Sequence, residues 1–283
     1  MAFLFWVITM EVLHLTAFSI KHDLHCHSIL SMCSSDELMN FPAIVAHAEQ
    51  SGYDTVCLTN HLWDGDRYAP GIYDWYAAQD ISHIQKALPR PESKSVRVLF
   101  GCETEYCGGA KIGLNKMHHD LFDFIVVPLT HMHLIGFVRP KEIDTEQKMA
   151  ELLIERMEEI QVLDLPWHKV GIAHSTCSLI FTQGDVVKVF DAMDEDRLYR
   201  ALHGFAKKGV GIELNACDFV NWQNSPESFL KQYRIAKAAG CKFYCASDAH
   251  TRESMDTIDL TLPDVVSALE LTENDRYIVP NRT

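Results

Sequence analysis

The stretch KHDLHCHS, residues 21–28, places three imidazoles and one carboxylate directly behind the apolar run AFSI. On an extended strand alternate side chains share a face, so His25 and His27 point to the same side, together with Asp23. Two neutral imidazoles aimed at one point can clamp a metal ion, although an HxH pattern also arises by chance on a polar edge strand. The stretch therefore predicts a metal-binding strand only if the rest of the chain supplies further ligands.

Outward from this stretch, short β-branched or aromatic runs alternate with helical patterns. The run HDLHC (22–26) is followed by the helical pattern PAIVAHAEQSG (42–52) and then by DTVCLTNH (54–61). Further strand-like runs follow at VRVLFGCET (96–104), FDFIVVPLTH (122–131), KVGIAHS (169–175), VGIELNA (210–216) and KFYCASDAH (242–250). Strands that alternate with helices predict a parallel sheet, either open or closed into a barrel.

Composition and organisation favour one globular unit. The chain has 283 residues, of which 47% are hydrophobic and 23% charged, as in ordinary globular proteins. No long Pro/Gly/Ser linker or repeat divides it, so we expect a single domain over residues 1–283, with residues 1–16 as a possible N-terminal extension. The net charge of −14 argues against broad nucleic-acid binding, whereas a small anionic substrate stays possible.

The cysteines and the N-terminal segment indicate the cellular compartment of the protein. Nine cysteines, mostly in apolar strand-like runs, indicate reduced buried thiols and hence a reducing cytoplasm. Residues 1–18 are apolar but lack a basic start, and Glu11 and His14 interrupt the run, so no membrane span is expected. An extra strand, a true start at Met10 and a signal peptide are the alternatives for this segment.

The predicted strands end on residues that ligate metals. In a parallel barrel the carboxyl ends of all strands open onto one face, where active sites are built. Chance explains one or two such residues, but hardly six strands that each end with His, Glu or Asp. The residues concerned are His25, His27, His61, Glu103, His131, His174, Asp248 and His250.

In this order, the motifs DLHCHS, LTNH, GCETE, PLTH, GIAH and SDAH resemble those of the polymerase and histidinol phosphatase (PHP) family of metal-dependent phosphoesterases. The resemblance implies a distorted (β/α)7 barrel, with one strand fewer than a TIM barrel. It also implies two or three divalent metal ions at the carboxyl face of the barrel. Stand-alone members hydrolyse phosphate esters, so the resemblance implies a hydrolase with a small phosphorylated substrate.

The resemblance also implies how the ligands divide. One metal would be held by His25, His27, Glu103 and Asp248, and a second by Glu103, His131 and His174, so that Glu103 bridges the two. A third would be held by His61 and His250. Members with three metals often carry histidine where this chain has Cys33, which either ligates as a thiolate or leaves the third site weak. Imidazole together with carboxylate suits Zn²⁺, Mn²⁺ or Fe²⁺.

Such a centre would lower the pKa of a bridging water and supply hydroxide for in-line attack on phosphorus. Glu103 and Asp248 are therefore predicted catalytic residues as well as ligands. Arg139 and Arg252 are further candidates, because a planar guanidinium can grip a phosphate, although each could instead be a solvated loop residue. We expect Asp23, Glu105, Glu213 and Asn215 to orient the ligating imidazoles.

The segment after His61 is rich in aromatic residues and could form a lid or stack a ring-bearing substrate. Packing of most of these rings onto the barrel is the simpler expectation. The segment contains Trp63, Arg67, Tyr68, Tyr73, Trp75 and Tyr76.

The sequence thus predicts a phosphatase acting on a small phosphomonoester, with histidinol phosphate as the example that the family suggests. An amidohydrolase-type barrel is the rival enzyme, but it usually carries a bridging lysine where this chain has Glu103. A metal-binding module without turnover is the third hypothesis. Substrate, metal identity and oligomeric state stay open at this point.

Overall fold

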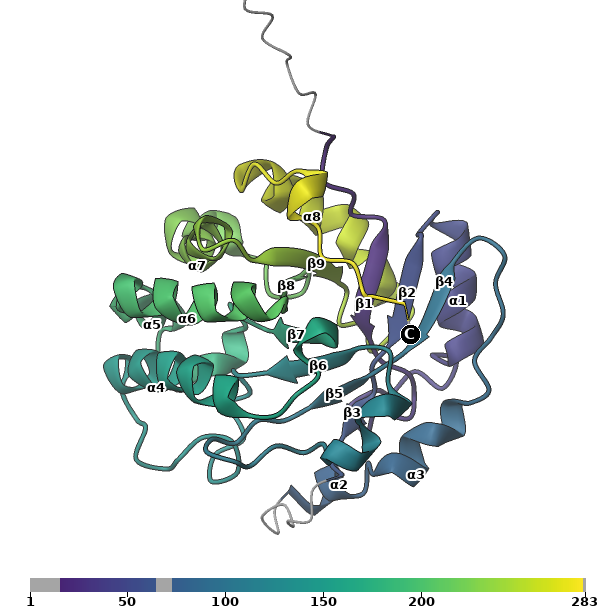
Figure 1. The fold of residues 1–283 in the computed structure, drawn as a ribbon, viewed down its shortest axis with the longest axis horizontal. Coiled ribbons are helices and arrows are strands. Elements are labelled where there is room, and N and C mark those ends of the chain that lie inside the picture. The colour runs from purple at the N-terminus through teal and green to yellow at the C-terminus, as the bar shows by residue number, and fades with distance from the viewer. Residues whose placement is uncertain (1–15, 65–72, 282–283) are drawn as a thin grey trace, which may run out of the picture.

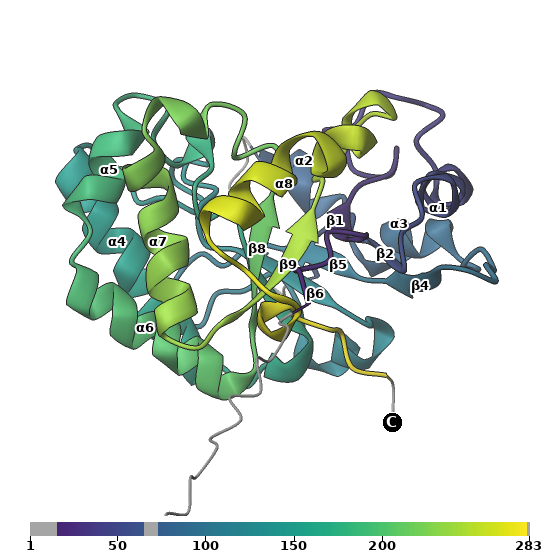
Figure 2. The same ribbon diagram turned by 90° about the horizontal axis from the view of Figure 1, so that it is seen from above.

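The computed structural model describes residues 16–64 and 73–281. Most of the possible N-terminal extension, together with Arg67 and Tyr68, lies outside these residues. Short parallel strands form the centre of the molecule and helices cover them from outside (Figure 1). Figure 2, seen from above, shows helices α4 to α7 on one side of the strands and helix α1 on the other.

The strands form two ladders, and every pairing within them is parallel. The order is β1-β2-β4 in one ladder and β3-β5-β6-β7-β8-β9 in the other. The strands are β1 (His22–Cys26), β2 (Thr55–Leu58), β3 (His61–Leu62), β4 (Arg97–Phe100), β5 (Cys102–Thr104), β6 (Ile125–Pro128), β7 (Val170–Ala173), β8 (Gly211–Asn215) and β9 (Lys242–Ala246). All-parallel pairing is the arrangement that the alternation of strands and helices predicts.

Two strands of the barrel are each broken into two short strands, and these breaks divide the sheet into two ladders. Thr59 and Asn60 separate β2 from β3, and Gly101 alone separates β4 from β5. A side chain at Gly101 would come within 2.6 Å of the Phe124 carbonyl oxygen, so only glycine fits where the strand breaks. In the described part of the chain, the nine short strands therefore occupy seven strand positions.

The ring of strands is joined between β1 and the segment that follows β9. A parallel bridge pairs Cys26 with Ala249. The Asp248 amide donates to the His25 carbonyl at 2.8 Å, and the His27 amide donates to the Ala249 carbonyl at 2.9 Å. Asp23 strengthens this seam by accepting hydrogen bonds from the Ser247 amide and hydroxyl. The fold is thus the distorted barrel of PHP type that the sequence predicts.

Helices cover the outside of the barrel. They are α1 (Phe41–Gln50), α2 (Asp74–Ala77), α3 (Ile81–Ile84), α4 (Glu146–Glu159), α5 (Val186–Ala192), α6 (Glu195–Lys208), α7 (Pro226–Ala238) and α8 (Thr257–Ala268). Helix α4 buries Met149, Leu153 and Met157, which recur at helical spacing. The helical pattern after Trp75 is broken in two, because the Asp80 side chain accepts from the His83 amide and begins a new helix.

A separate cluster of buried side chains comes from β1, β2, β4, β6, β7 and β9, together with Tyr277 and Val279 of the C-terminal segment. Phe124, Tyr244 and Tyr277 are its aromatic members, and their rings pack edge-on or tilted against one another. Side chains that meet across so many strands of a barrel fill its interior. Within the described residues, no helix combines the length and the apolar character needed to cross a bilayer.

Candidate metal centre

The metal-type residues of the strand ends meet at one end of the barrel. They border a pocket of about 350 Å³ whose lining includes His61, Glu103, His131, His174 and Asp248. His250 and Cys33 also line this pocket, and His25 and His27 lie fully buried against Glu103. The structure therefore brings together all nine residues that the sequence singles out as ligands.

Glu103 lies at the centre of this group, and its two oxygens face different histidines. Oε2 is 3.4 Å from the Nε2 atoms of both His25 and His27. Oε1 faces His174 Nε2 at 3.5 Å and His131 Nε2 at 3.8 Å. A carboxylate placed in this way can bridge two cations.

Asp248 closes the first set of ligands. Its Oδ1 is 3.2 Å from His27 Nε2 and 3.6 Å from His25 Nε2, while its Oδ2 is 3.7 Å from His174 Nε2. Burial acts to raise the pKa of Asp248, but His174 and His25 outweigh it and hold that pKa far below its usual range. The carboxylate therefore stays ionised and available to a cation.

A third set of side chains lies beside the first. Donor atoms of His27, His61 and His250 lie within 4.8 Å of one another, and the rings of His27 and His250 stack with centroids 4.2 Å apart. Cys33 is exposed at the pocket and bonds both His250 and His61. Desolvation alone would raise the pKa of the Cys33 thiol, but these two imidazoles lower it to about 6.

The donor set fits a divalent cation. Glu103 is fully buried, and His61 Nδ1 lies 2.7 Å from its Oε2, yet in the described structure neither of its oxygens accepts a hydrogen bond of good geometry. Burial acts to raise the pKa of Glu103, but His61 and His25 lower it well below its usual range, so the buried carboxylate is charged. A charged and unsatisfied buried carboxylate among imidazoles is unfavourable without a cation between them.

Hydrogen bonds from behind turn four imidazoles so that Nε2 faces the centre. Glu213 contacts His25 Nδ1 at 2.6 Å, Glu105 contacts His131 Nδ1 at 2.7 Å, and Ser31 contacts His27 Nδ1 at 2.9 Å. Asn215 lies 3.2 Å from His174 Nδ1, and Asp218 lies 3.5 Å from the same atom. Bonds of this kind fix the orientation and the tautomer of a ligating histidine.

Among the residues expected to orient imidazoles, Glu105, Glu213 and Asn215 contact the rings. Asp23 instead bonds Ser247 and the His25 amide, so it holds the backbone of the barrel seam. Sequence reasoning missed Ser31 and Asp218. Asp218 follows Asn215 by three residues at the end of β8, and this position was the available signal.

The ligand positions after β7 and β9 have an unusual backbone. His174 and Asp248 adopt φ angles of 60° and 51°, in the left-handed region where residues other than glycine are uncommon, with Asn, Asp and His the most frequent among them. The Glu213 carboxylate accepts from the His174 amide at 2.9 Å and helps to hold that turn. Backbone strain of this kind clusters at functional sites.

The two arginines lie elsewhere. Arg139 is buried, with its guanidinium 5.9 Å from the Phe181 ring centroid and Nη2 donating to Gln183. Arg252 pairs with Asp36 at 3.0 Å. Neither is among the residues that line the pocket. Their phosphate-binding role stays a prediction.

Most of the aromatic side chains after His61 pack onto the barrel. Trp63 and Tyr76 are buried, and the Tyr76 hydroxyl donates to Glu105 at 2.7 Å and lies 3.2 Å from His61 Nδ1. Tyr73 stacks on Phe137. Trp75 is partly exposed and lines the pocket.

Comparisons with known proteins agree with this arrangement. The sequence matches the PHP domain family over residues 23–217, well over half of the chain. Among solved structures, the histidinol phosphate phosphatase HISK from Lactococcus lactis subsp. lactis Il1403, complexed with zinc, L-histidinol and phosphate, has a TM-score of 0.53 and 14% identity. That match covers 92% of this chain and 99% of the other, and at this identity it shows likeness of fold alone.

A further match is the structural study of YwqE from Bacillus subtilis and CpsB from Streptococcus pneumoniae, described as metal-dependent tyrosine phosphatases. It has a TM-score of 0.35 and 18% identity, and covers 91% of this chain and 96% of that one. A search of curated proteins gave no significant match. On the family match, the chain belongs to the PHP domain family of metal-dependent phosphoesterases.

Proposed function

We propose that this protein is a phosphatase that hydrolyses a small phosphomonoester with two or three bound divalent metal ions. The observation that carries the proposal is Glu103. Its carboxylate is buried and ionised, its oxygens accept no hydrogen bond of good geometry, and each oxygen faces a separate group of imidazoles. Membership of the PHP family supports the same chemistry.

We propose that His25, His27, Glu103 and Asp248 hold one metal, and that Glu103, His131 and His174 hold a second. His61, His250 and Cys33 would hold a third. Imidazole nitrogen together with carboxylate oxygen suits Zn²⁺, Mn²⁺ or Fe²⁺, and a thiolate at the third position favours Zn²⁺. When bound, the metals would supply activated water and neutralise charge on the phosphoryl oxygens.

The protein side chains would then position these groups. Glu105, Glu213 and Asp218 accept from Nδ1 of the imidazoles, so the ligands need little rearrangement when a cation arrives. Tyr76 bonds Glu105 from the pocket side and keeps that carboxylate directed at His131. Histidinol phosphate is one substrate of the proposed class.

Two further proposals concern the whole chain. None of the nine cysteines, all of which lie in the described residues, forms a disulfide, which supports a reducing, cytoplasmic location. We also propose that residues 1–283 form a single domain, with residues 1–16 as a possible N-terminal extension, since the seam between β1 and the segment after β9 joins the first and last strands of the barrel.

The test is metal analysis of protein purified without chelator, followed by assays on a phosphoester panel with and without added Mn²⁺ or Zn²⁺. We expect about two or three metal ions per chain and phosphate release that chelation abolishes and metal restores. Absence of bound metal, or turnover that chelation leaves unchanged, would contradict the proposal. Hydrolysis of amides or lactones without hydrolysis of phosphoesters would favour the amidohydrolase hypothesis instead.

A further inference from the structure

The pocket above the candidate metal centre has an apolar rim formed by Trp75, Leu134 and Leu179. The three side chains come from three different segments of the barrel face. Trp75 lies on α2, Leu134 follows His131 by three residues, and Leu179 follows His174 by five residues. The loops that carry proposed ligands therefore also carry the rim.

The rim is held in place by the same contacts that support the centre. The Trp75 ring packs against Tyr76, with centroids 5.2 Å apart, and the Tyr76 hydroxyl reaches Glu105. The Leu134 amide donates to the His131 carbonyl, and the Leu179 amide donates to the Cys177 sulfur. A group bound between the rim side chains would thus lie at a fixed place relative to the ligands.

Two rim residues leave much of their apolar surface in water. Trp75 is 39% exposed and Leu179 is 41% exposed, whereas Leu134 is buried. Covering exposed apolar surface is favourable in proportion to the area covered. An apolar group on a bound ligand would gain this free energy, which a hydroxylated or charged group would not.

The pocket offers little to a charged leaving group. Within the described residues, no Lys or Arg lines it, and its two carboxylates, Glu103 and Asp248, face the imidazoles of the centre. His133 is the one lining imidazole outside the proposed ligands, and it can make a hydrogen bond to a single polar atom. Small-molecule sites typically combine apolar walls with a few polar groups of this kind.

We propose that the substrate is the phosphate monoester of an uncharged alcohol bearing an aromatic or bulky apolar group, which packs between Trp75 and Leu179. The inference rests on the proposed function and narrows its substrate class, so that esters of charged alcohols such as histidinol fall outside it. Water adds to phosphorus, the bond between phosphorus and the alcohol oxygen breaks, and a proton from water passes to that oxygen. The products are inorganic phosphate and the apolar alcohol.

The test compares three primary alkyl monoesters whose leaving groups are chemically similar: 2-phenylethyl, ethyl and 2-aminoethyl phosphate. For the metal-loaded protein we expect kcat/KM for the phenylethyl ester to exceed that for the ethyl ester by at least about tenfold. The aminoethyl ester should be no better than the ethyl ester. Equal kcat/KM for the phenylethyl and ethyl esters, or preference for the charged ester, would overturn the inference.

Variants locate the preference in the rim. Trp75→Ala and Leu179→Asn should each reduce the phenylethyl-to-ethyl ratio to about twofold, whereas Trp75→Phe, which keeps a ring, should retain most of it. Leu260→Ala, at a leucine 79% exposed on α8, is the matched control and should leave the ratio unchanged. If the phenylethyl-to-ethyl ratio of kcat/KM is unchanged in both Trp75→Ala and Leu179→Asn, the apolar group is recognised elsewhere and the proposed role of the rim is refuted.

A binding measurement separates this inference from the proposed function. Calorimetry with the non-hydrolysable 2-phenylethylphosphonate and ethylphosphonate reports recognition without turnover. Tighter binding of the phenylethyl compound by about tenfold would support recognition of an apolar group by the rim. If no ester is hydrolysed in that case, only the phosphatase proposal fails. Equal binding of both compounds, with ester hydrolysis intact, would refute recognition by the rim and leave the phosphatase proposal standing.

Discussion

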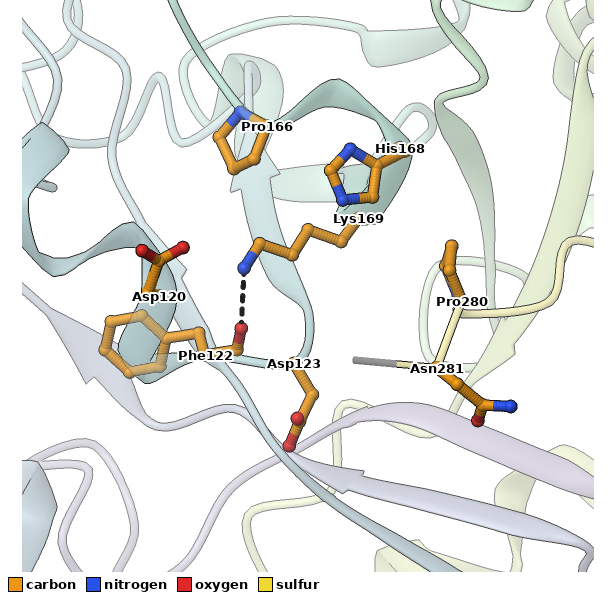
Figure 3. Close-up of a pocket in the computed structure, with 8 residues that line it drawn as sticks. All are labelled: Asp120, Phe122, Asp123, Pro166, His168, Lys169, Pro280 and Asn281. Atoms are coloured by element: carbon orange, nitrogen blue, oxygen red, sulfur yellow. Dashed lines mark hydrogen bonds between the residues drawn. The ribbon is translucent and has the colours of Figure 1, made fainter. Parts of the chain in front are cut away.

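The barrel has a pocket at each end, and the two differ in chemistry rather than in size. The pocket at the carboxyl ends of the strands measures about 350 Å³, and the one at the amino ends measures about 370 Å³. Figure 3 shows the latter, with side chains from just before β6 and β7 and from the C-terminal segment around it. The aromatic cluster of Phe124, Tyr244 and Tyr277 lies in the barrel interior.

Charged groups at the amino-end pocket have ordinary partners. Lys169 donates to the His119 and Phe122 carbonyls at 3.0 Å each, and Figure 3 draws the second of these bonds. Asp123 pairs with Arg90 at 2.6 Å and accepts from the Phe100 amide. Glu103 at the other end is charged and surrounded by imidazoles, yet in the described structure it accepts no hydrogen bond of good geometry, even from His61 at 2.7 Å. Unsatisfied buried charge, and not volume, therefore marks the functional end.

The largest expected difference between the two ends comes from removing one carboxylate at each. Glu103→Gln should lower kcat/KM by at least about a thousandfold, because the proposed bridge between metals is lost. Asp123→Asn should keep kcat/KM within about threefold while costing about 1–3 kcal/mol of unfolding free energy. Steady-state kinetics and chemical denaturation of both variants measure these effects. Similar losses of activity in the two variants would erase the distinction between the ends.

The next effect concerns a residue that supports the centre from behind. Glu105→Gln should weaken metal affinity by about 10–100-fold, because His131 loses the carboxylate that orients its ring. Competition with a chelating dye measures the affinity. Glu159→Gln, at the end of α4 and outside the pocket, is the matched control. Unchanged affinity in Glu105→Gln would show that metal binding does not depend on the orientation of His131 by Glu105.

A smaller and more local effect is expected at Cys33. With cobalt in the centre, a thiolate ligand should give a sulfur-to-cobalt charge-transfer band that Cys33→Ser abolishes, together with about tenfold weaker binding of the last metal ion. Cys33→His should restore the affinity without restoring the band. Cys217→Ser removes another exposed thiol and should leave the spectrum unchanged. A band that persists in Cys33→Ser would assign it to a different cysteine.

The smallest effect compares a buried histidine of β1, His22, with His47 on α1. Burial, with Arg276 nearby, lowers the pKa of His22 to about 3, and its Nε2 accepts from the Cys245 amide. As the pH falls below about 6.5, the His22 imidazole is protonated in the unfolded chain but stays neutral in the folded protein. The free energy of unfolding should therefore decrease below about pH 6.5, by up to about 1.4 kcal/mol per pH unit. His22→Gln should flatten this dependence relative to wild type, whereas His47→Gln on α1 should not. Urea denaturation between pH 4 and pH 7 measures both.

Much of this could be predicted from the strand ends. The identity of the strands, their parallel order and the convergence of residues such as Glu103 and Asp248 follow from local patterns and from the geometry of barrels. The ligand groups follow from short motifs, since each strand contributes only the residues at its own end. That the motifs match a known family made the fold prediction specific.

The rest depends on contacts between distant segments. Nothing near Arg139 in the sequence indicates that Gln183 and Phe181 would surround it, and nothing near Arg252 indicates its pairing with Asp36. In the sequence, Tyr76 is one of several aromatic residues in a predicted loop, and nothing there indicates that its hydroxyl donates to Glu105. Such partners are fixed by loop conformation, which periodicity does not encode.

The left-handed backbone at His174 and Asp248 has a consequence for how this protein can be changed. Glycine would relieve the conformational cost at either position but would remove a side chain that faces Glu103 or His27. Selection for thermostability alone would therefore erode these two positions first. At these two places the barrel keeps a residue for its side chain where the backbone conformation alone would favour glycine.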